Sequence, residues 1–198
     1  MIEITNINDS QPYSLFKTFY ENALSNGEEN IEAILISSFD KEKEEVDARY
    51  VNLKYISGDR WIFFTNYKSP KSIQFQSHNQ ITAVFYWKSI NLQIRIKANI
   101  FKTSESFSNN HFINRAPEKN ALAISSNQSE TINSYNDVIN NYEEELKSAG
   151  GAERPKYWGG YSFTPYCMEF WEGHPSRLNK RQLFQRVGTS WELSYLQP

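Results

Sequence analysis

WGGYSFTPYCMEFWEGHPSRLNKR, residues 158–181, combines a Gly-Gly pair, two tryptophans and two arginines in one stretch near the C-terminus. Indole rings offer flat apolar surface, and guanidinium groups donate paired hydrogen bonds that match the geometry of a phosphate. The stretch therefore suits a planar, phosphorylated ligand. Spacing alone favours a simpler interpretation, in which two strands bury Trp158 and Trp171 and expose Arg177 and Arg181 to solvent.

The composition gives the chain no general attraction for polyanions. A formal net charge of -2 and a pI of ≈ 6.0 create no basic field, so nucleic acid is not an expected partner and any anion site must be local. No apolar run reaches the ~20 residues that a membrane helix needs, and the N-terminus lacks the pattern of a signal peptide. We therefore expect a cytoplasmic protein without a membrane partner.

The cysteine and histidine content limits disulfide and metal chemistry. The single cysteine, Cys167, excludes an intrachain disulfide, and its apolar neighbours predict a small, buried hydrophobic side chain. The histidines His78, His111 and His174 are far apart in the sequence and lack the helical spacing of metal ligands. We expect no metal site.

The pattern of apolar residues predicts an α+β chain, mainly β with peripheral helices. The 198 residues suffice for one domain, with a first helix at 12–26, a barrel at 31–103, a helical insert at 104–148 and C-terminal strands at 157–198. Gly150 and Gly151 would end the last helix of the insert. The antiparallel connections suggest a closed or partly split barrel. Strands are expected at 31–39, 46–55, 61–65, 81–87, 92–101, 160–171, 177–187 and 191–196, and helices of the insert at 104–114 and 135–148.

A short helix after the strand at 61–65 predicts a local anion site. Ser69 can cap this helix, Pro70 suits its first position, and Lys71 lies in its first turn. The arrangement puts a cation beside free backbone N–H groups, which favours phosphate binding.

Several segments together resemble the pyridoxine (pyridoxamine) 5'-phosphate oxidase family. WGGY, EFWEG and SRLNKR resemble its C-terminal signature, RYVNLK at 49–54 its Arg-to-Lys strand, and FFTNYKSPK at 63–71 its Tyr-Thr-Asn…Ser-Arg-Lys segment. Gln93 and the pair Gln128 and Ser129 also fall at family positions. The resemblance spans residues from about 12 to 198 in the expected order, and it is strong although each motif is individually weak.

The resemblance implies an FMN-binding split β-barrel, formed as a homodimer with FMN in clefts between the subunits. Arg and Lys suit the phosphate of FMN, and Gln amides suit the polar edge of its ring. Pro70 stands where the family commonly has an arginine, which removes one phosphate donor. The FMN-binding positions carried over are Arg49, Tyr50, Val51, Asn52, Leu53, Lys54, Phe64, Thr65, Lys71, Gln93, Gln128, Ser129, Trp171 and Arg181.

The substrate side departs further from the family. A tyrosine, an arginine and a serine that grip the substrate phosphate in the family correspond to His111, Arg115 and Lys119. In the family's Arg-Leu-His-Asp-Arg run, here residues 177–181, Asn179 replaces the histidine that faces the pyridine ring. Spacing of i, i+4 and i+8 would put His111, Arg115 and Lys119 on one cationic face of a helix. This face could bind an anion or could simply be exposed to solvent, and the sequence favours neither interpretation. The substrate-binding positions carried over are Lys54, His111, Arg115, Lys119, Arg177 and Asn179.

The resemblance implies an oxidase that moves a hydride from an amine or alcohol carbon to FMN, which oxygen then reoxidises. Arg177 is the residue expected at the reacting centre, where a permanently charged guanidinium orients and stabilises rather than acting as a base. The substrate would be a small phosphorylated or planar cyclic molecule. The changed positions leave two alternatives: an oxidase of another cyclic metabolite such as a phenazine precursor, or an FMN-binding carrier, sensor or reductase without vitamin-oxidase turnover.

Overall fold

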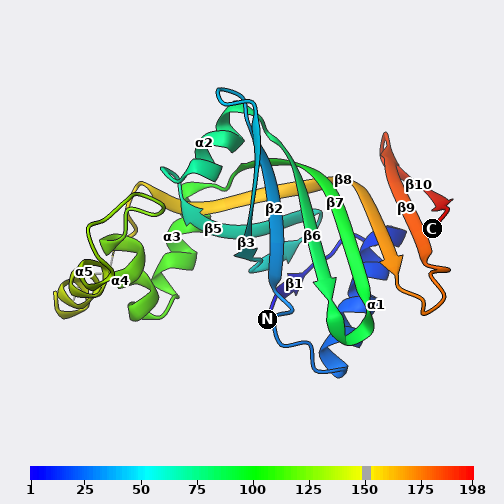
Figure 1. The fold of residues 1–198 in the computed structure, drawn as a ribbon, viewed down its shortest axis with the longest axis horizontal. Coiled ribbons are helices and arrows are strands. Elements are labelled where there is room, and N and C mark those ends of the chain that lie inside the picture. The colour runs from blue at the N-terminus through cyan, green and yellow to red at the C-terminus, as the bar shows by residue number, and fades with distance from the viewer. Residues whose placement is uncertain (149–152) are drawn as a thin grey trace.

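One curled sheet organises the computed structural model, which describes residues 1–148 and 153–198 (Figure 1). Its hydrogen-bonded order is β1-β4-β5-β8-β7-β6-β2-β3, with β9 added to β8 and β10 to β9. The pairing of β1 with β4 is parallel and the other pairings are antiparallel. The strands in the described residues are β1 (Glu3–Thr5), β2 (Ala33–Asp40), β3 (Glu45–Asn52), β4 (Tyr55–Ser57), β5 (Arg60–Asn66), β6 (Gln80–Trp87), β7 (Leu92–Lys102), β8 (Trp158–Glu172), β9 (Lys180–Val187) and β10 (Ser190–Leu196).

The sheet curls into a barrel because its edge at β3 reaches β5. The backbone N–H of Lys54, just beyond β3, donates to the carbonyl of Ile62 on β5 at 2.8 Å. Along β7 the residues Leu92, Ile94 and Ile96 are fully buried, whereas their neighbours in the chain are partly or largely exposed. This period of two gives the sheet one apolar face, which fills the barrel.

Strand β8 runs along most of the molecule and joins its two ends (Figure 1). Its first part pairs with β5, its second part pairs with β9, and β7 lies beside almost all of it. Lys97 pairs with Cys167 whereas Ala98 pairs with Pro165, which leaves Tyr166 as an extra residue in β8. Such a β-bulge bends a strand and increases its twist.

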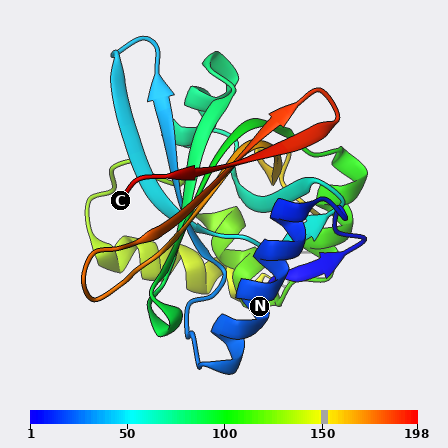
Figure 2. The same cartoon turned by 90° about the vertical axis from the view of Figure 1, so that its right-hand side faces the viewer.

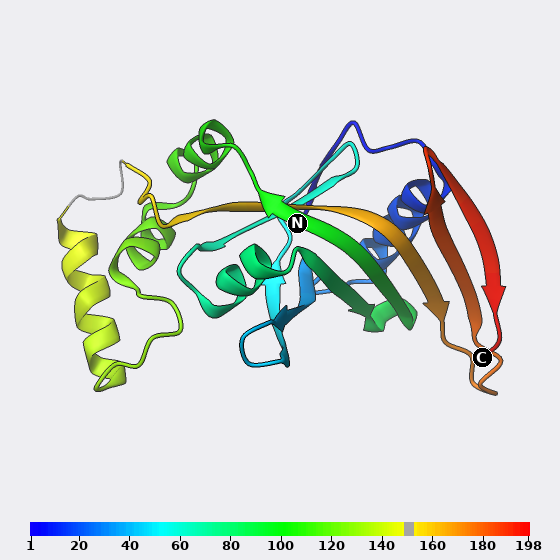
Figure 3. The same ribbon diagram turned by 90° about the horizontal axis from the view of Figure 1, so that it is seen from above.

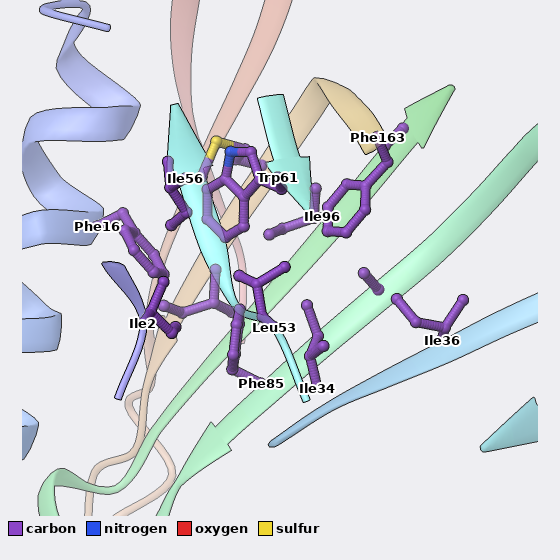
Figure 4. Packing of buried hydrophobic residues seen from close by; sticks show 14 of the residues in the cluster. Ile2, Phe16, Ile34, Ile36, Leu53, Ile56, Trp61, Phe85, Ile96 and Phe163 are labelled. Atoms are coloured by element: carbon purple, nitrogen blue, oxygen red, sulfur yellow. The ribbon is translucent and has the colours of Figure 1, made fainter. Parts of the chain in front are cut away.

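Helix α1 (Gln11–Ser25) closes one end of the barrel with aromatic side chains. Its Phe16 packs against Trp61 with ring centroids 4.5 Å apart and against Phe85 at 5.9 Å (Figure 4). Helix α1 also lies beside the C-terminal hairpin (Figure 2). There Tyr13 contacts Trp191 of β10 with ring centroids 6.0 Å apart. Burial of these large rings is the main source of stability at this end.

The other helices lie near the opposite end of β8. Helix α2 (Pro70–Ser77) follows β5, and α3 (Glu105–Ile113), α4 (Pro117–Ser125) and α5 (Tyr135–Lys147) form the insert between β7 and β8. Figure 3 shows α4 and α5 at the end remote from the β9–β10 hairpin. A 3-10 turn, η1 (Lys88–Ile90), joins β6 to β7. Within the described residues, no helix has both the length and the apolar character needed to cross a membrane.

Several elements differ from the sequence expectations. The expected strand at 46–55 is interrupted, because β3 ends at Asn52 and β4 begins at Tyr55. Helix α4 and strand β1 were not predicted, and β9 begins at Lys180 instead of residue 177. Cys167 is half-buried rather than buried, since the bulge places it on the outer side of the sheet. The expected stop at Gly150 and Gly151 lies outside the described residues.

Candidate functional site

A cleft of ≈ 910 Å³ lies where β3 and β5 face the helical insert. Strand β3 and its continuation supply one wall, β5 and the start of α2 a second, and the α3–α4 region with the segment after α4 a third. Residues singled out from the sequence that line this cleft are Arg49, Tyr50, Val51, Asn52, Lys54, Phe64, Thr65, Lys71, His111, Arg115, Lys119, Gln128 and Ser129. The fold therefore brings together four separate segments of the chain.

Arg49 and Lys71 form a cationic end of the cleft. Arg49 Nη1 donates to Ser38 Oγ at 2.6 Å, and its Nη2 lies 3.4 Å from Gln74 Oε1 and also pairs with the carboxylate of Asp47. Lys71 lies in the first turn of α2, where the helix dipole favours an anion. The expected free N–H groups are mostly used, because Pro70 has none and those of Ser72 and Ile73 donate to the Ser69 carbonyl at 2.9 and 3.2 Å. Two cations beside a helix N-terminus make this end suited to a phosphate.

Lys71 is buried without a neutralising carboxylate. Lys71 is only 5% exposed, and its Nζ donates to Ser69 Oγ at 3.2 Å. Within the described residues, no carboxylate oxygen lies within 4.0 Å of this Nζ. Burial, followed by repulsion from Arg49, lowers the pKa of Lys71 to about 8, and attraction to the more distant Asp47 offsets this only in part. A buried cation of this kind gains stability when an external anion binds it.

The side-chain amide of Gln128 joins the segment after α4 to β5. Gln128 Oε1 accepts hydrogen bonds from Thr65 Oγ1 at 3.0 Å and from the backbone N–H of Asn66 at 3.2 Å. Ser129, beside it, has a left-handed backbone with φ 72°. The segment after α4 is thus fixed against the end of β5, next to Lys71.

A column of flat groups lines the far side of the cleft. The ring of His111 stacks on Phe64 with centroids 3.6 Å apart and planes 7° apart, and Phe64 stacks on Trp158 at 5.3 Å. The guanidinium of Arg115 lies 4.5 Å from the centre of the Trp158 ring. These contacts give the cleft a rigid aromatic wall with a cation at its edge.

His111 is held neutral in this wall. Its Nδ1 lies 2.8 Å from the hydroxyl of Tyr55. Burial, followed by repulsion from Arg115 and Lys54, lowers the pKa of His111 to about 4. At neutral pH this side chain therefore offers hydrogen bonds and a flat ring, but no charge.

Lys54, Arg115 and Lys119 supply the remaining positive charge of the cleft. Lys54 Nζ pairs with Glu32 Oε1 at 2.6 Å, and Arg115 Nη1 donates to Asn120 Oδ1 at 3.2 Å. The expected single helical face was wrong, because α3 ends at Ile113 and α4 begins at Pro117. His111, Arg115 and Lys119 reach the same cleft from α3, the connection and α4 in turn.

Gln93, Trp171 and Arg181 form a second group on neighbouring strands. Gln93 of β7 pairs in register with Trp171 of β8, which pairs with Arg181 of β9. Their side of the sheet is opposite to the one that carries the core residues Ile94 and Phe170. They do not line the cleft.

Glu169 is the centre of this second group. It is 3% exposed and accepts hydrogen bonds from Arg181 Nε at 2.9 Å, from Arg181 Nη2 at 2.7 Å and from Arg95 Nε at 3.1 Å. Burial alone would raise its pKa, but the bonds from Arg95 and Arg181 hold the pKa of Glu169 below its usual value. This carboxylate therefore fixes the orientation of Arg181.

The connection between β8 and β9 contains the two other C-terminal residues singled out from the sequence. Arg177 is exposed and has a left-handed backbone with φ 60°, and its N–H donates to the carbonyl of His174 at 2.9 Å. Asn179 Oδ1 accepts from the N–H of His174 at 3.0 Å. Neither residue lines the cleft. Leu53, which was expected to bind FMN, does not line it either, because its side chain is fully buried in the core.

Comparison with known proteins connects both groups to one family. The model for the "Pyridoxine 5'-phosphate oxidase C-terminal dimerisation region" matches residues 158–198. Pyridoxine/pyridoxamine 5'-phosphate oxidases of Legionella pneumophila (strain Lens) and Microcystis aeruginosa are 34% and 36% identical, each over 96% of this chain and 89% of its own length. The chain belongs to the pyridoxine/pyridoxamine 5'-phosphate oxidase family.

Solved structures confirm the split-barrel fold of this family. PhzG from Burkholderia lata 383, in complex with tetrahydrophenazine-1-carboxylic acid, superposes with a TM-score of 0.90 at 24% identity over 96% of this chain and 93% of its own. A pyridoxamine 5'-phosphate oxidase-related, FMN-binding protein from Nostoc punctiforme gives 0.76 at 10% identity, over 96% and 99% of the two chains. The predicted fold class, mainly β with peripheral helices, is also confirmed.

Membership of the oxidase family makes the chain an oxidoreductase and gives the second group a context. The segment that matches the family's dimerisation region contains Trp171, Arg177, Asn179 and Arg181. Sequence reasoning did not single out Asp47, Glu169 or Trp158 as parts of the two groups. Trp158 was signalled by the WGGY motif, and Asp47 by its spacing of two residues from Arg49 on the same strand. Glu169 depends on which strands are neighbours.

Proposed function

We propose that this chain is an FMN-dependent oxidase related in activity to pyridoxamine/pyridoxine 5'-phosphate oxidase, working as a homodimer with FMN at the subunit interface. The observation that carries the proposal is the cleft itself. It combines a phosphate-suited end at Arg49 and Lys71 with an aromatic and cationic wall at His111 and Arg115. One anion-bearing cofactor and one anion-bearing substrate account for both ends.

The residues around Lys71 fit the phosphate of FMN. The Lys71 ammonium and the Arg49 guanidinium supply charge and N–H donors, and the start of α2 adds the positive end of its dipole. Thr65 and the segment with Gln128 and Ser129 would contact the neighbouring part of the cofactor. Bound FMN would supply the hydride acceptor, with oxygen as the final oxidant.

A second copy of the chain would complete each cleft. Gln93, Trp171 and Arg181 lie away from the cleft, and two of them fall in the segment that matches the family's dimerisation region. A two-fold interface brings the same surface of both copies together, so each copy can offer this group to the other's cleft. The buried Glu169 would keep Arg181 oriented for that contact.

The substrate would be a small molecule with a planar ring and an anionic group. Lys54, Arg115 and Lys119 would bind the anion, and neutral His111 would add a hydrogen bond. Arg177 and Asn179, from the dimerisation segment, would reach the reacting carbon of a substrate in the other subunit's cleft. Arg177 stays protonated, so its role would be to orient the substrate and stabilise charge.

The changed clamp favours a second candidate of the same reaction class. His111 and Lys119 stand where the family has tyrosine and serine, so the cleft offers a substrate an extra cation and an imidazole ring in place of a phenol. A cyclic carboxylate such as a phenazine precursor would use both features. An FMN carrier, sensor or reductase would need only the phosphate end and would show no oxidase turnover.

Purified protein tests the proposal in two steps. Bound FMN would give the protein a yellow colour and an equimolar flavin content after denaturation. Aerobic incubation with pyridoxamine phosphate, pyridoxine phosphate or tetrahydrophenazine-1-carboxylic acid should then release peroxide with one of them. Flavin binding without peroxide from any of the three would contradict the oxidase and leave the carrier function. Arg177→Ala should abolish turnover with FMN retained.

A further inference from the structure

Asp47 occupies an unexpected position for an acidic residue in a phosphate-suited cleft. It lines the cleft together with Arg49 and Lys71, and its carboxylate Oδ2 pairs with Arg49 Nη2. Asp47 and Arg49 are two residues apart on β3, so their side chains leave the strand on the same side. A negative charge therefore stands beside the cations that would bind a phosphate.

Arg49 does not depend on Asp47 for its orientation. Its Nη1 donates to Ser38 Oγ at 2.6 Å, and Ser38 is 3% exposed on the neighbouring strand β2. Gln74 of α2 adds an acceptor 3.4 Å from Nη2 and also accepts from Ser38. These neutral contacts would keep the guanidinium in place if the carboxylate were removed.

A phosphate bound between Arg49 and Lys71 would lie near the Asp47 carboxylate. The two anions would repel each other and compete for the same guanidinium nitrogen. The side chain of Asp47 is 51% exposed and that of Arg49 21%, so solvent screens the interaction only in part. The carboxylate can turn to solvent when a phosphate arrives, at the expense of its ion pair.

We propose that Asp47 is an internal competitor for the phosphate-binding cations and that it limits the affinity of this chain for FMN. The inference rests on the proposed function, because it assigns the phosphate of FMN to Arg49 and Lys71. In the protein without FMN, the Asp47 carboxylate would neutralise Arg49 in place of the phosphate. The phosphate would displace this carboxylate when FMN binds. Its effect would be confined to ligands that carry a phosphate at this end.

The test compares cofactor affinities of the wild-type protein and the Asp47→Asn variant. Flavin-free protein is titrated with FMN, and with riboflavin as the phosphate-free probe, while flavin fluorescence is followed. Asp47→Asn should lower the Kd for FMN about three- to fivefold, in line with a partly screened ion pair. The Kd for riboflavin should stay within about twofold, because the neutral probe does not meet the carboxylate.

Glu45→Gln is the matched control. Glu45 lies on the same strand and the same side, two residues before Asp47, but it does not line the cleft. The substitution removes the same charge without touching Arg49. It should change the Kd for FMN by less than about twofold.

Two results would overturn the inference: an FMN Kd of Asp47→Asn equal to or above that of the wild type, or an equal gain with Glu45→Gln. Failure of both proteins to bind FMN would contradict the proposed function instead. Inorganic phosphate then decides the inference, because phosphate must raise the Tm of Asp47→Asn more than that of the wild type. An equal rise in both would overturn it.

Discussion

The cleft and the outer face of β7–β9 both contain buried or half-buried cations, but Lys71 of the cleft and Arg181 of the outer face differ in whether a carboxylate bonds to them. On the outer face, Glu169 is buried between Arg95 and Arg181 and bonds to both. In the cleft, Lys71 is buried without such a partner among the described residues. A cation with an internal carboxylate is fixed for orientation, whereas one without it is available to an external anion. Arg181 therefore suits a fixed contact and Lys71 suits the binding of an anion, although both are cations with restricted exposure.

Glu169→Gln should give the largest effect, on stability. Removing one partner of a buried ion network leaves the others uncompensated, so we expect a loss of about 3 kcal/mol in the free energy of unfolding. Urea unfolding at fixed protein concentration measures it. Glu172→Gln is the control, because Lys180 Nζ lies 2.8 Å from Glu172 Oε1 in a more exposed pair and should contribute under about 1 kcal/mol. Equal losses in both variants would remove the distinction between the two regions.

Acid should act on the same network. The pKa of Glu169 is below its usual value in the folded protein, so its contribution is complete above the unfolded pKa and is lost as pH falls through the folded pKa. The wild-type protein should therefore lose stability on acidification more steeply than Glu169→Gln. Parallel pH curves for the two proteins would contradict this.

Lys71→Met should give the next largest effect, on ligand affinity instead of folding. Losing a charge-assisted contact with phosphate should raise the Kd for FMN about 10- to 100-fold. The folded protein should become no less stable, because a buried cation without a partner is removed. Flavin titration and urea unfolding measure the two quantities. A large loss of stability with unchanged affinity would show that Lys71 is structural.

The pKa of Lys71 gives this prediction a pH dependence. The pKa falls from 10.5 to about 8 in the empty folded protein. Below pH 8 Lys71 is already charged, and above it binding must first take up a proton, so FMN affinity should fall as pH rises through 8. Lys71→Arg stays charged and should bind without this fall. By the same linkage, the empty wild-type protein should gain stability between pH 8 and 10.5.

His111→Phe should give the smallest effect at neutral pH. The folded pKa of about 4 lies below the usual 6.5, so the unfolded chain binds more protons between these values and wild-type stability declines as pH falls from 6.5 towards 4. Phenylalanine keeps the stack on Phe64 and should remove this decline, with a change under about 1 kcal/mol at pH 7. Thermal unfolding across this range measures it. An unchanged decline would place its origin in other residues.

The sequence predicted the cleft better than the outer face because the cleft depends on local motifs. Ser69 and Lys71 are close in the chain, so their placement at the start of α2 followed from helix preferences. The expected side-chain cap was wrong, because the Ser69 hydroxyl donates to the Asn66 carbonyl at 2.8 Å and caps no helix N–H. The network at Glu169 depends on β7 and β9 lying on either side of β8, which no local pattern reveals. Helix α4 was missed although it is as long as α3, because Ala116 at its N-cap gives no capping signal, whereas Ser104 caps α3.

The extra residue Tyr166 changes which side chains of β8 face the core. Before it, the core-facing side chains are odd-numbered, as at Tyr161 and Phe163, and after it they are even-numbered, as at Met168 and Phe170. An unbroken alternation would turn Glu169 and Trp171 inward, into the hydrocarbon of the barrel. One inserted residue thus lets a single strand present Trp158 to the cleft at one end and Trp171 to the exterior at the other.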